Sequence, residues 1–126
     1  MKNILLTIIF LSALACSKSD DESNINVEGN YIGTFERKGT ISNVEIDLKN
    51  SAFTGKSDTE KFPAICRGSF EMSHNTVTFR DECPWTAEFD WSLILSGKWD
   101  VRFKKNTLIL TNSLGDSYHL TRKRLQ

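Results

Sequence analysis

Residues 64–83, AICRGSFEMSHNTVTFRDEC, carry the clearest indication of the fold. Apolar and polar side chains alternate on both sides of residues 74–75, as they do in two strands joined by a two-residue turn. Residues opposed across such a hairpin have a constant index sum and must lie on the same face of the sheet. The sum set by this turn pairs Phe70 with Phe79 and matches polarity at every other pair. The stretch therefore predicts a β-hairpin, with Asn75 as the turn residue that tolerates a positive φ.

Short segments of alternating polarity recur along the chain from Gly29 onward, separated by turn residues every eight to twelve positions. No 11-residue window in this region has helical periodicity. The spacing predicts an all-β fold, a small antiparallel up-and-down barrel of about eight strands. The predicted strands are residues 30–37, 40–49, 52–56, 64–72, 76–82, 89–103 with a break at Gly97, 107–112 and 116–123.

The last three strands can be aligned by the same arithmetic. A turn at residues 105–106 opposes Phe103 to Leu108, and a three-residue loop ending at Gly115 opposes Leu108 to Leu120. The three strands then share one continuous apolar face. Gly115 suits the left-handed position that such a loop commonly requires.

The first residues have the layout of a secretory signal, with basic Lys2 followed by an apolar run over residues 4–15. As a helix this run would span about 18 Å, short of the roughly 30 Å of a bilayer core. The segment LSALAC, residues 11–16, resembles the lipobox of bacterial lipoproteins, in which the cysteine is lipidated and becomes the mature N-terminus. We therefore expect a signal peptide over residues 1–15 and a membrane anchor at Cys16. The alternative is a soluble secreted protein cleaved at the same point.

Residues 16–28 contain too few apolar side chains to order themselves, and we expect them to form a flexible acidic tether. The folded domain would then cover residues 29–126. Within the tether, KSDDE at residues 18–22 resembles the acidic export signal that sends Bacteroidetes lipoproteins to the cell surface; the alternative is a plain hydrophilic spacer. We therefore expect an exported lipoprotein that is anchored in the outer membrane, on either the periplasmic side or the cell-surface side of that membrane.

Two cysteines remain once Cys16 carries lipid, and disulfides persist in exported proteins. The register of the first hairpin opposes Cys66 to Cys83 at a non-hydrogen-bonded pair, where Cα atoms approach to about 4.5 Å. A metal or redox pair is the rival interpretation, but the chain has no Cys-x-x-Cys, and His74 and His119 fall in a predicted turn and on a polar face. We predict a structural disulfide.

The ends of the predicted barrel carry a family resemblance. The opening GNYIGTF, residues 29–35, and the closing LIL and YHLTR, residues 108–110 and 118–122, resemble the lipocalin-like lipoproteins common in Bacteroidetes. Tyr31 stands where true lipocalins carry Trp, so the resemblance is to the wider calycin-like group. It implies an up-and-down barrel that holds a small apolar ligand, and it implies no catalytic residue and no cofactor.

Several functional classes lack support in the sequence. The 16 basic residues balance the 16 acidic ones, which gives no electrostatic basis for nucleic-acid binding. Nucleotide-binding, EF-hand, metalloprotease and Gly-x-Ser-x-Gly patterns do not occur, so we expect neither an enzyme nor a cofactor. A cluster of acidic residues flanks Trp85 at irregular spacing and predicts a solvated loop held by the disulfide rather than a Ca²⁺ site. Its members are Asp81, Glu82, Glu88 and Asp90.

Aromatic side chains alternate onto the inward faces of the predicted strands. An eight-stranded barrel encloses either packed side chains or one small ligand. The first function we expect is therefore binding of a small apolar or amphipathic molecule. The alternative is a surface protein-interaction module, an accessory subunit or inhibitor, with a filled barrel and an apolar patch around Trp85 and Trp91. The residues predicted to line a ligand cavity are Tyr31, Phe35, Phe70, Phe79, Trp99, Phe103 and Tyr118.

Overall fold

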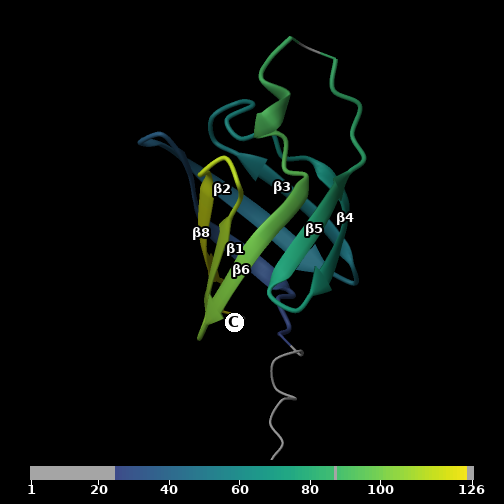
Figure 1. The fold of residues 1–126 in the computed structure, drawn as a ribbon, viewed down its shortest axis with the longest axis vertical. Coiled ribbons are helices and arrows are strands. Elements are labelled where there is room, and N and C mark those ends of the chain that lie inside the picture. The colour runs from purple at the N-terminus through teal and green to yellow at the C-terminus, as the bar shows by residue number, and fades with distance from the viewer. Residues whose placement is uncertain (1–24, 87, 125–126) are drawn as a thin grey trace, which may run out of the picture.

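The computed structural model describes residues 25–86 and 88–124, and these form a closed antiparallel barrel of eight strands in chain order (Figure 1). Each strand pairs with the next, and the first pairs with the last across a seam from Tyr31–Arg122 to Glu36–Ser117. Among the described residues, no helix has the length and apolar character needed to cross a membrane. The strands are β1 Gly29–Arg37, β2 Thr40–Lys49, β3 Ala52–Ser57, β4 Arg67–Ser73, β5 Thr76–Asp81, β6 Gly97–Lys104, β7 Thr107–Thr111 and β8 Ser117–Arg122.

The predicted hairpin registers are confirmed. Phe70 pairs with Phe79, Phe103 with Leu108 and Leu108 with Leu120. Gly115 has the expected positive φ of 92°. At the first turn, however, the left-handed residue is His74, with φ 57°, and not Asn75.

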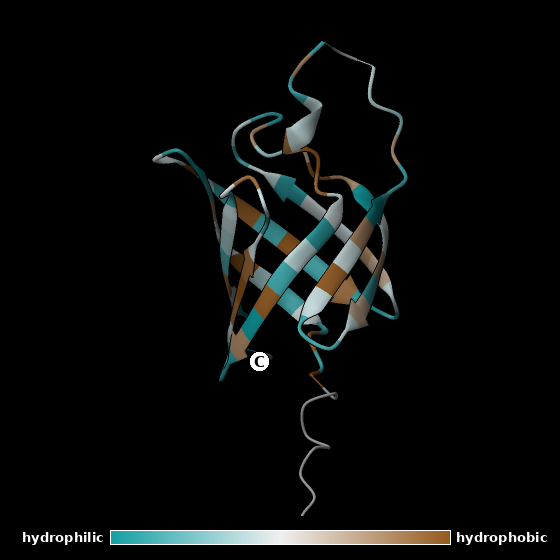
Figure 2. Ribbon diagram, in the orientation of Figure 1, coloured by the Kyte–Doolittle hydropathy of each residue, from teal (hydrophilic) through white to brown (hydrophobic). Residues whose placement is uncertain are grey.

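The barrel is apolar inside and polar outside. Along β2 in Figure 2, hydrophobic and hydrophilic residues alternate, which is the two-residue period of a sheet with one face buried. In β2, for example, Val44, Ile46 and Leu48 are buried while Asn43 and Glu45 are exposed. Burial of these inward side chains is the main source of the stability of the fold.

The predicted strand over residues 89–103 is wrong in its first half. Residues 91–93 form a 3-10 helix (η2), and β6 begins only at Gly97, whose φ is 81°. The predicted strand at 64–72 likewise begins late, at Arg67. In both places the apolar run leaves the barrel wall, and Ala64 forms an isolated parallel bridge with Ile94 above the end of the barrel. The hydrophobic pattern gave no means to distinguish a wall strand from a buried loop segment.

Four connections, three of them long, lie at one end of the barrel, which we call the loop end. They comprise residues 38–39, 58–66, 82–96 and 112–116. The opposite end, called the entry end, holds the start of β1, the three turns at residues 50–51, 74–75 and 105–106, and the end of β8. Figure 1 shows the 82–96 loop at the top and the start of β1 at the bottom.

The packed domain begins before Glu28, earlier than the sequence predicts. Val27, which we expected in the tether, is buried, and its carbonyl accepts a 2.7 Å hydrogen bond from the Tyr31 hydroxyl. Ile25 also packs against the core. The predicted lipidation site at Cys16 and the predicted signal peptide lie outside the described residues.

A disulfide joins Cys66 and Cys83, as predicted, two positions beyond the last paired residues of the β4–β5 hairpin. The two Cα atoms are 6.3 Å apart rather than the expected 4.5 Å. The difference arises because regular pairing ends at Gly68–Asp81, and the two strands diverge as they enter the loops.

Removing the disulfide should destabilise the domain substantially. A bridge that closes a loop of 17 residues stabilises a fold by about 3 kcal/mol on chain entropy. We expect Cys66→Ser/Cys83→Ser to lower the Tm by roughly 10–20 °C in a thermal melt. A reducing agent should lower the Tm of the wild-type protein by a similar amount. The same agent should leave the Tm of the double variant unchanged. Rapid alkylation of both thiols in the unreduced native protein would contradict the bridge.

Candidate functional site

The residues predicted to line a ligand cavity are brought together, and they form the core of the barrel. Six of the seven are buried; Phe103, near the entry end, is half-buried. Tyr118 lies at the centre, with its ring centroid 5.0 Å from that of Phe35 and 5.2 Å from that of Trp99. Burial raises the pKa of the Tyr118 phenol well above its usual value, and the charge of Asp116 adds to this effect. The contacts of Tyr118 with Phe35 and Trp99 are the edge and tilted ring contacts of a packed aromatic core.

Two loop segments cover the loop end of this core. The Ala64 amide donates to the Leu93 carbonyl at 2.9 Å, and the Leu95 amide donates to the Ala64 carbonyl at the same distance. Leu95 and Ile65 are buried, and the Phe62 ring meets Phe35 edge to face with centroids 5.5 Å apart. The alternating pattern predicts strands for Ile65, Leu93 and Leu95, so it does not indicate this cover.

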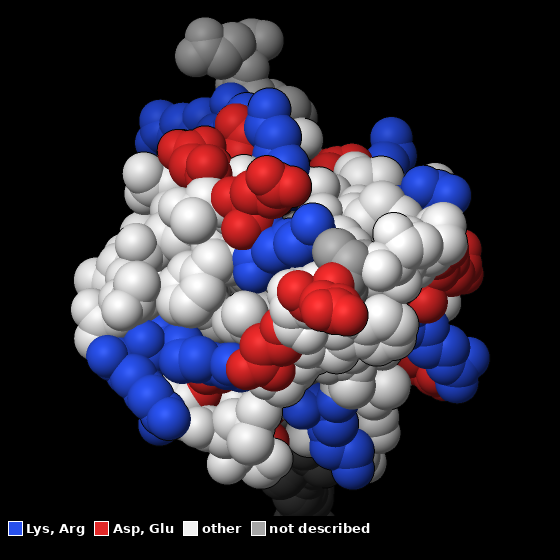
Figure 3. All heavy atoms as spheres, turned by 90° about the horizontal axis from the view of Figure 1, so that it is seen from above, with Lys and Arg blue, Asp and Glu red and all other residues white. Residues whose placement is uncertain are grey.

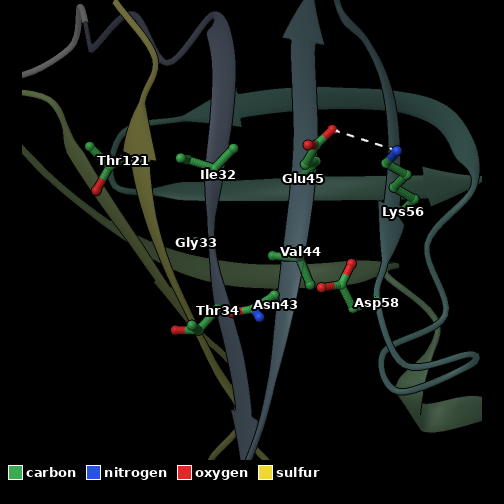
Figure 4. A pocket seen from close by; sticks show the side chains of 9 residues that line it. All are labelled: Ile32, Gly33, Thr34, Asn43, Val44, Glu45, Lys56, Asp58 and Thr121. Atoms are coloured by element: carbon green, nitrogen blue, oxygen red, sulfur yellow. Dashed lines mark ion pairs between the residues drawn. The ribbon is translucent and has the colours of Figure 1, made fainter.

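Several grooves lie on the outer surface of the barrel. One groove of about 560 Å³ runs over β1 and β2. Figure 4 shows its lining: Ile32 and Thr34 from β1, Asn43 and Glu45 from β2, and Lys56, whose amine is 4.0 Å from the Glu45 carboxylate. The groove is open and mixed in character, and its lining includes no histidine or cysteine.

The 82–96 loop presents an aromatic row at the loop end. The Trp85 and Phe89 rings meet at 5.7 Å, and the Phe89 and Trp91 rings at 6.2 Å. The Trp85 indole N–H donates to Asp81 at 2.8 Å, and the Lys61 amine lies 5.5 Å above the Phe89 ring. With the disulfide at its base, the loop holds three large rings in a defined order. We call Trp85, Phe89 and Trp91 the aromatic row.

Arg37 ties this loop to the barrel. Its guanidinium donates two hydrogen bonds to the buried carboxylate of Asp116, at 2.8 and 2.6 Å, and one to the exposed Asp90 at 3.1 Å. The hydrogen bonds to Asp116 are the largest cause of a raised Arg37 pKa. Asp90 also accepts the Ser92 amide at 3.0 Å, and hydrogen bonds from Ser92 are the main cause of its lowered pKa. Arg37 therefore joins β1, the β7–β8 turn and the aromatic loop.

Sequence reasoning did not identify Arg37 or Asp116, and no local signal could have done so. The two residues are 79 positions apart, and each lies in a pattern typical of an exposed turn or strand end. Only closure of the barrel, which places the end of β1 beside the start of β8, brings them into contact.

The predicted acidic cluster is dispersed along the loop. Asp81 binds Trp85, Asp90 binds Arg37, and Glu82 and Glu88 are exposed. Across residues 25–86 and 88–124, no group of three or more His, Cys, Asp or Glu side chains is arranged to hold a metal ion. His74 lies in the β4–β5 turn and His119 on the outer face of β8, both exposed.

The exposed large apolar side chains are concentrated at the loop end. Ile41 is 59% exposed, Trp91 55% and Leu114 61%, and each lies on or beside a loop-end connection. The fourth, Ile32, lies on the barrel wall in the groove of Figure 4.

Comparison with protein-family models, with curated proteins and with solved structures found no match to this chain.

Proposed function

We propose that this protein is a membrane-anchored, exported lipoprotein whose filled barrel presents the loop end to a protein partner. The observation that carries the proposal is that three of the four exposed large apolar side chains lie at that end, one of them in the disulfide-held aromatic row. Exposed apolar groups within a polar surround are characteristic of protein interfaces, and Trp is enriched among the residues that dominate binding. Figure 3 views the loop end and shows acidic and basic side chains interspersed among uncharged ones.

The packed interior favours this function over a ligand container. A container needs a hollow lined by the inward rings and an open mouth. Here the rings contact one another, and Leu95 and Ile65 cover the loop end. The lipocalin-like resemblance supports the barrel architecture in this proposal and supplies no ligand. Anchoring at Cys16 and an outer-membrane location remain part of the proposal, on the lipobox resemblance alone.

Truncating Trp91 should weaken partner binding strongly. Loss of a dominant interface tryptophan costs at least about 2 kcal/mol, which corresponds to a roughly 30-fold weaker Kd. We would cross-link the protein in intact cells, identify the partner by mass spectrometry and measure its affinity for purified wild type and Trp91→Ala. The matched control is Ile32→Ala, which removes an exposed apolar side chain from the barrel wall instead. Equal affinity of the two variants would overturn the assignment of the loop end.

A second experiment tests the container alternative directly. Val101 is buried and points inward, so Val101→Trp should overpack a filled barrel and cost about 1–3 kcal/mol of stability. The neighbouring Arg102 side chain points outward, so Arg102→Trp should leave stability nearly unchanged. We expect no saturable quenching of Trp99 fluorescence by a fatty-acid probe in the wild type. Saturable quenching that Val101→Trp abolishes without loss of stability would instead establish a container.

A further inference from the structure

Two grooves at the entry end are lined by basic side chains. The first, of about 480 Å³, lies where the chain enters and leaves the barrel and includes Arg122, Lys123 and Arg124. The second, of about 790 Å³, lies over the end of β6 and includes Arg102, Lys104 and Lys105. The Arg122 amide donates to the Asn106 carbonyl at 2.8 Å, so the two grooves adjoin. We call these six cations the basic edge.

The charges of the basic edge are not neutralised within the fold. Five of its six side chains are exposed, and none forms an ion pair with a carboxylate of the described residues. Glu28 is the single acidic residue lining either groove, and its carboxylate accepts the Asn50 amide at 2.9 Å. The loop end, by contrast, mixes both signs of charge (Figure 3).

Apolar groups lie between these cations. The half-buried Phe103 and Ile109 line the second groove. The Arg122 guanidinium lies 4.9 Å from the centre of the Phe103 ring and 5.7 Å from that of Tyr31, and it donates to the Asn26 carbonyl at 3.1 Å. Arg122 is therefore held in place, while the other five cations extend into solvent. Cations beside apolar side chains suit the boundary between lipid headgroups and acyl chains.

The length of the preceding chain would keep this edge close to a membrane. The described chain begins at Ile25, beside the first groove, and only eight residues, 17–24, separate it from the proposed anchor at Cys16. The nine Cα-to-Cα steps between Cys16 and Ile25 cannot span more than about 30 Å. A lipid on Cys16 would thus hold the entry end, and not the loop end, next to the bilayer.

We propose that the basic edge lies against an anionic lipid surface and orients the barrel with its loop end away from the membrane. This inference rests on the membrane anchor in the proposed function. Each Lys or Arg near an anionic surface strengthens association by about fivefold at low salt. The anchor holds the protein at the membrane, and the basic edge fixes which end faces the lipid.

The test compares lysine reactivity on two kinds of vesicle. The lipidated protein, made in a host that processes lipoproteins, is reconstituted into neutral phosphatidylcholine vesicles or into vesicles containing phosphatidylglycerol. We expect Lys104, Lys105 and Lys123 to be acetylated several-fold more slowly on the anionic vesicles, and high salt to remove this protection. Lys38 and Lys98, at the loop end, should react equally on both. If each of the five lysines is acetylated at the same rate on the neutral and on the anionic vesicles, the proposal is overturned.

Charge variants separate this inference from the anchor itself. Lys104→Gln/Lys105→Gln/Lys123→Gln should remove the difference between vesicles while leaving the protein bound, and Lys38→Gln/Lys56→Gln/Lys98→Gln, with the same change of net charge, should retain it. A protein that fails to partition into neutral vesicles would refute the anchor. In that case sedimentation with anionic vesicles decides: salt-sensitive binding lost in the first triple variant supports the basic edge, and no binding overturns it.

Discussion

Replacing Asp116 by alanine should lower the free energy of unfolding by about 3 kcal/mol, because it leaves Arg37 without its buried partner. The Asp116 side chain is only 2% exposed and the Arg37 side chain 16%. Removing one member of a buried pair costs more than the pair contributes, since the remaining charge stays partly desolvated. Urea unfolding of the wild type and the variant measures the difference.

The same arginine offers an internal control. Asp90 also pairs with Arg37, but its side chain is 58% exposed, and Asp90→Ala should change stability little. Asp116→Asn retains the shape and can still accept a hydrogen bond, so its effect should lie between the two. Equal effects of Asp116→Ala and Asp90→Ala would show that burial of the pair does not matter.

Gly33→Ala should cost at least about 3 kcal/mol by forcing open the seam that closes the barrel. A Cβ at this position would lie 1.9 Å from the His119 carbonyl oxygen and 2.8 Å from the Leu120 Cα, both of them backbone atoms of β8. Because backbone cannot move aside as a flexible side chain can, β1 and β8 must separate. Hydrogen exchange should show faster exchange of the amides along this seam, together with the loss of stability.

Gly39→Ala is the matched substitution. The methyl group would meet no atom within 4 Å, but the residue has a φ of 84°, so only backbone strain of about 1 kcal/mol is expected. A Gly33→Ala variant as stable as Gly39→Ala would contradict the close approach of β1 and β8.

The registers of the hairpins, and the disulfide across the first of them, follow from the amino-acid sequence alone. The Phe70–Phe79 and Phe103–Leu108 pairs, and the cysteines beyond the first, follow from a turn position and a period of two, which are local properties of the chain. Even the error at His74 is local, a shift of one residue within a correctly placed turn. Such features can be read from neighbouring residues because their geometry depends on few of the others.

The cover of the loop end, the Arg37–Asp116 pair and the packing of the interior depend on contacts between distant parts of the chain. The apolar run before Gly97 has the composition of a buried strand, but the wall is complete without it, and the run folds over the loop end instead. The Arg37–Asp116 pair joins residues 79 apart through the β1–β8 seam. Whether the aromatic rings fill the barrel or leave a hollow depends on the summed volumes and orientations of side chains from all eight strands. These outcomes are set by closure of the barrel and close packing inside it, and alternating polarity along a strand specifies neither.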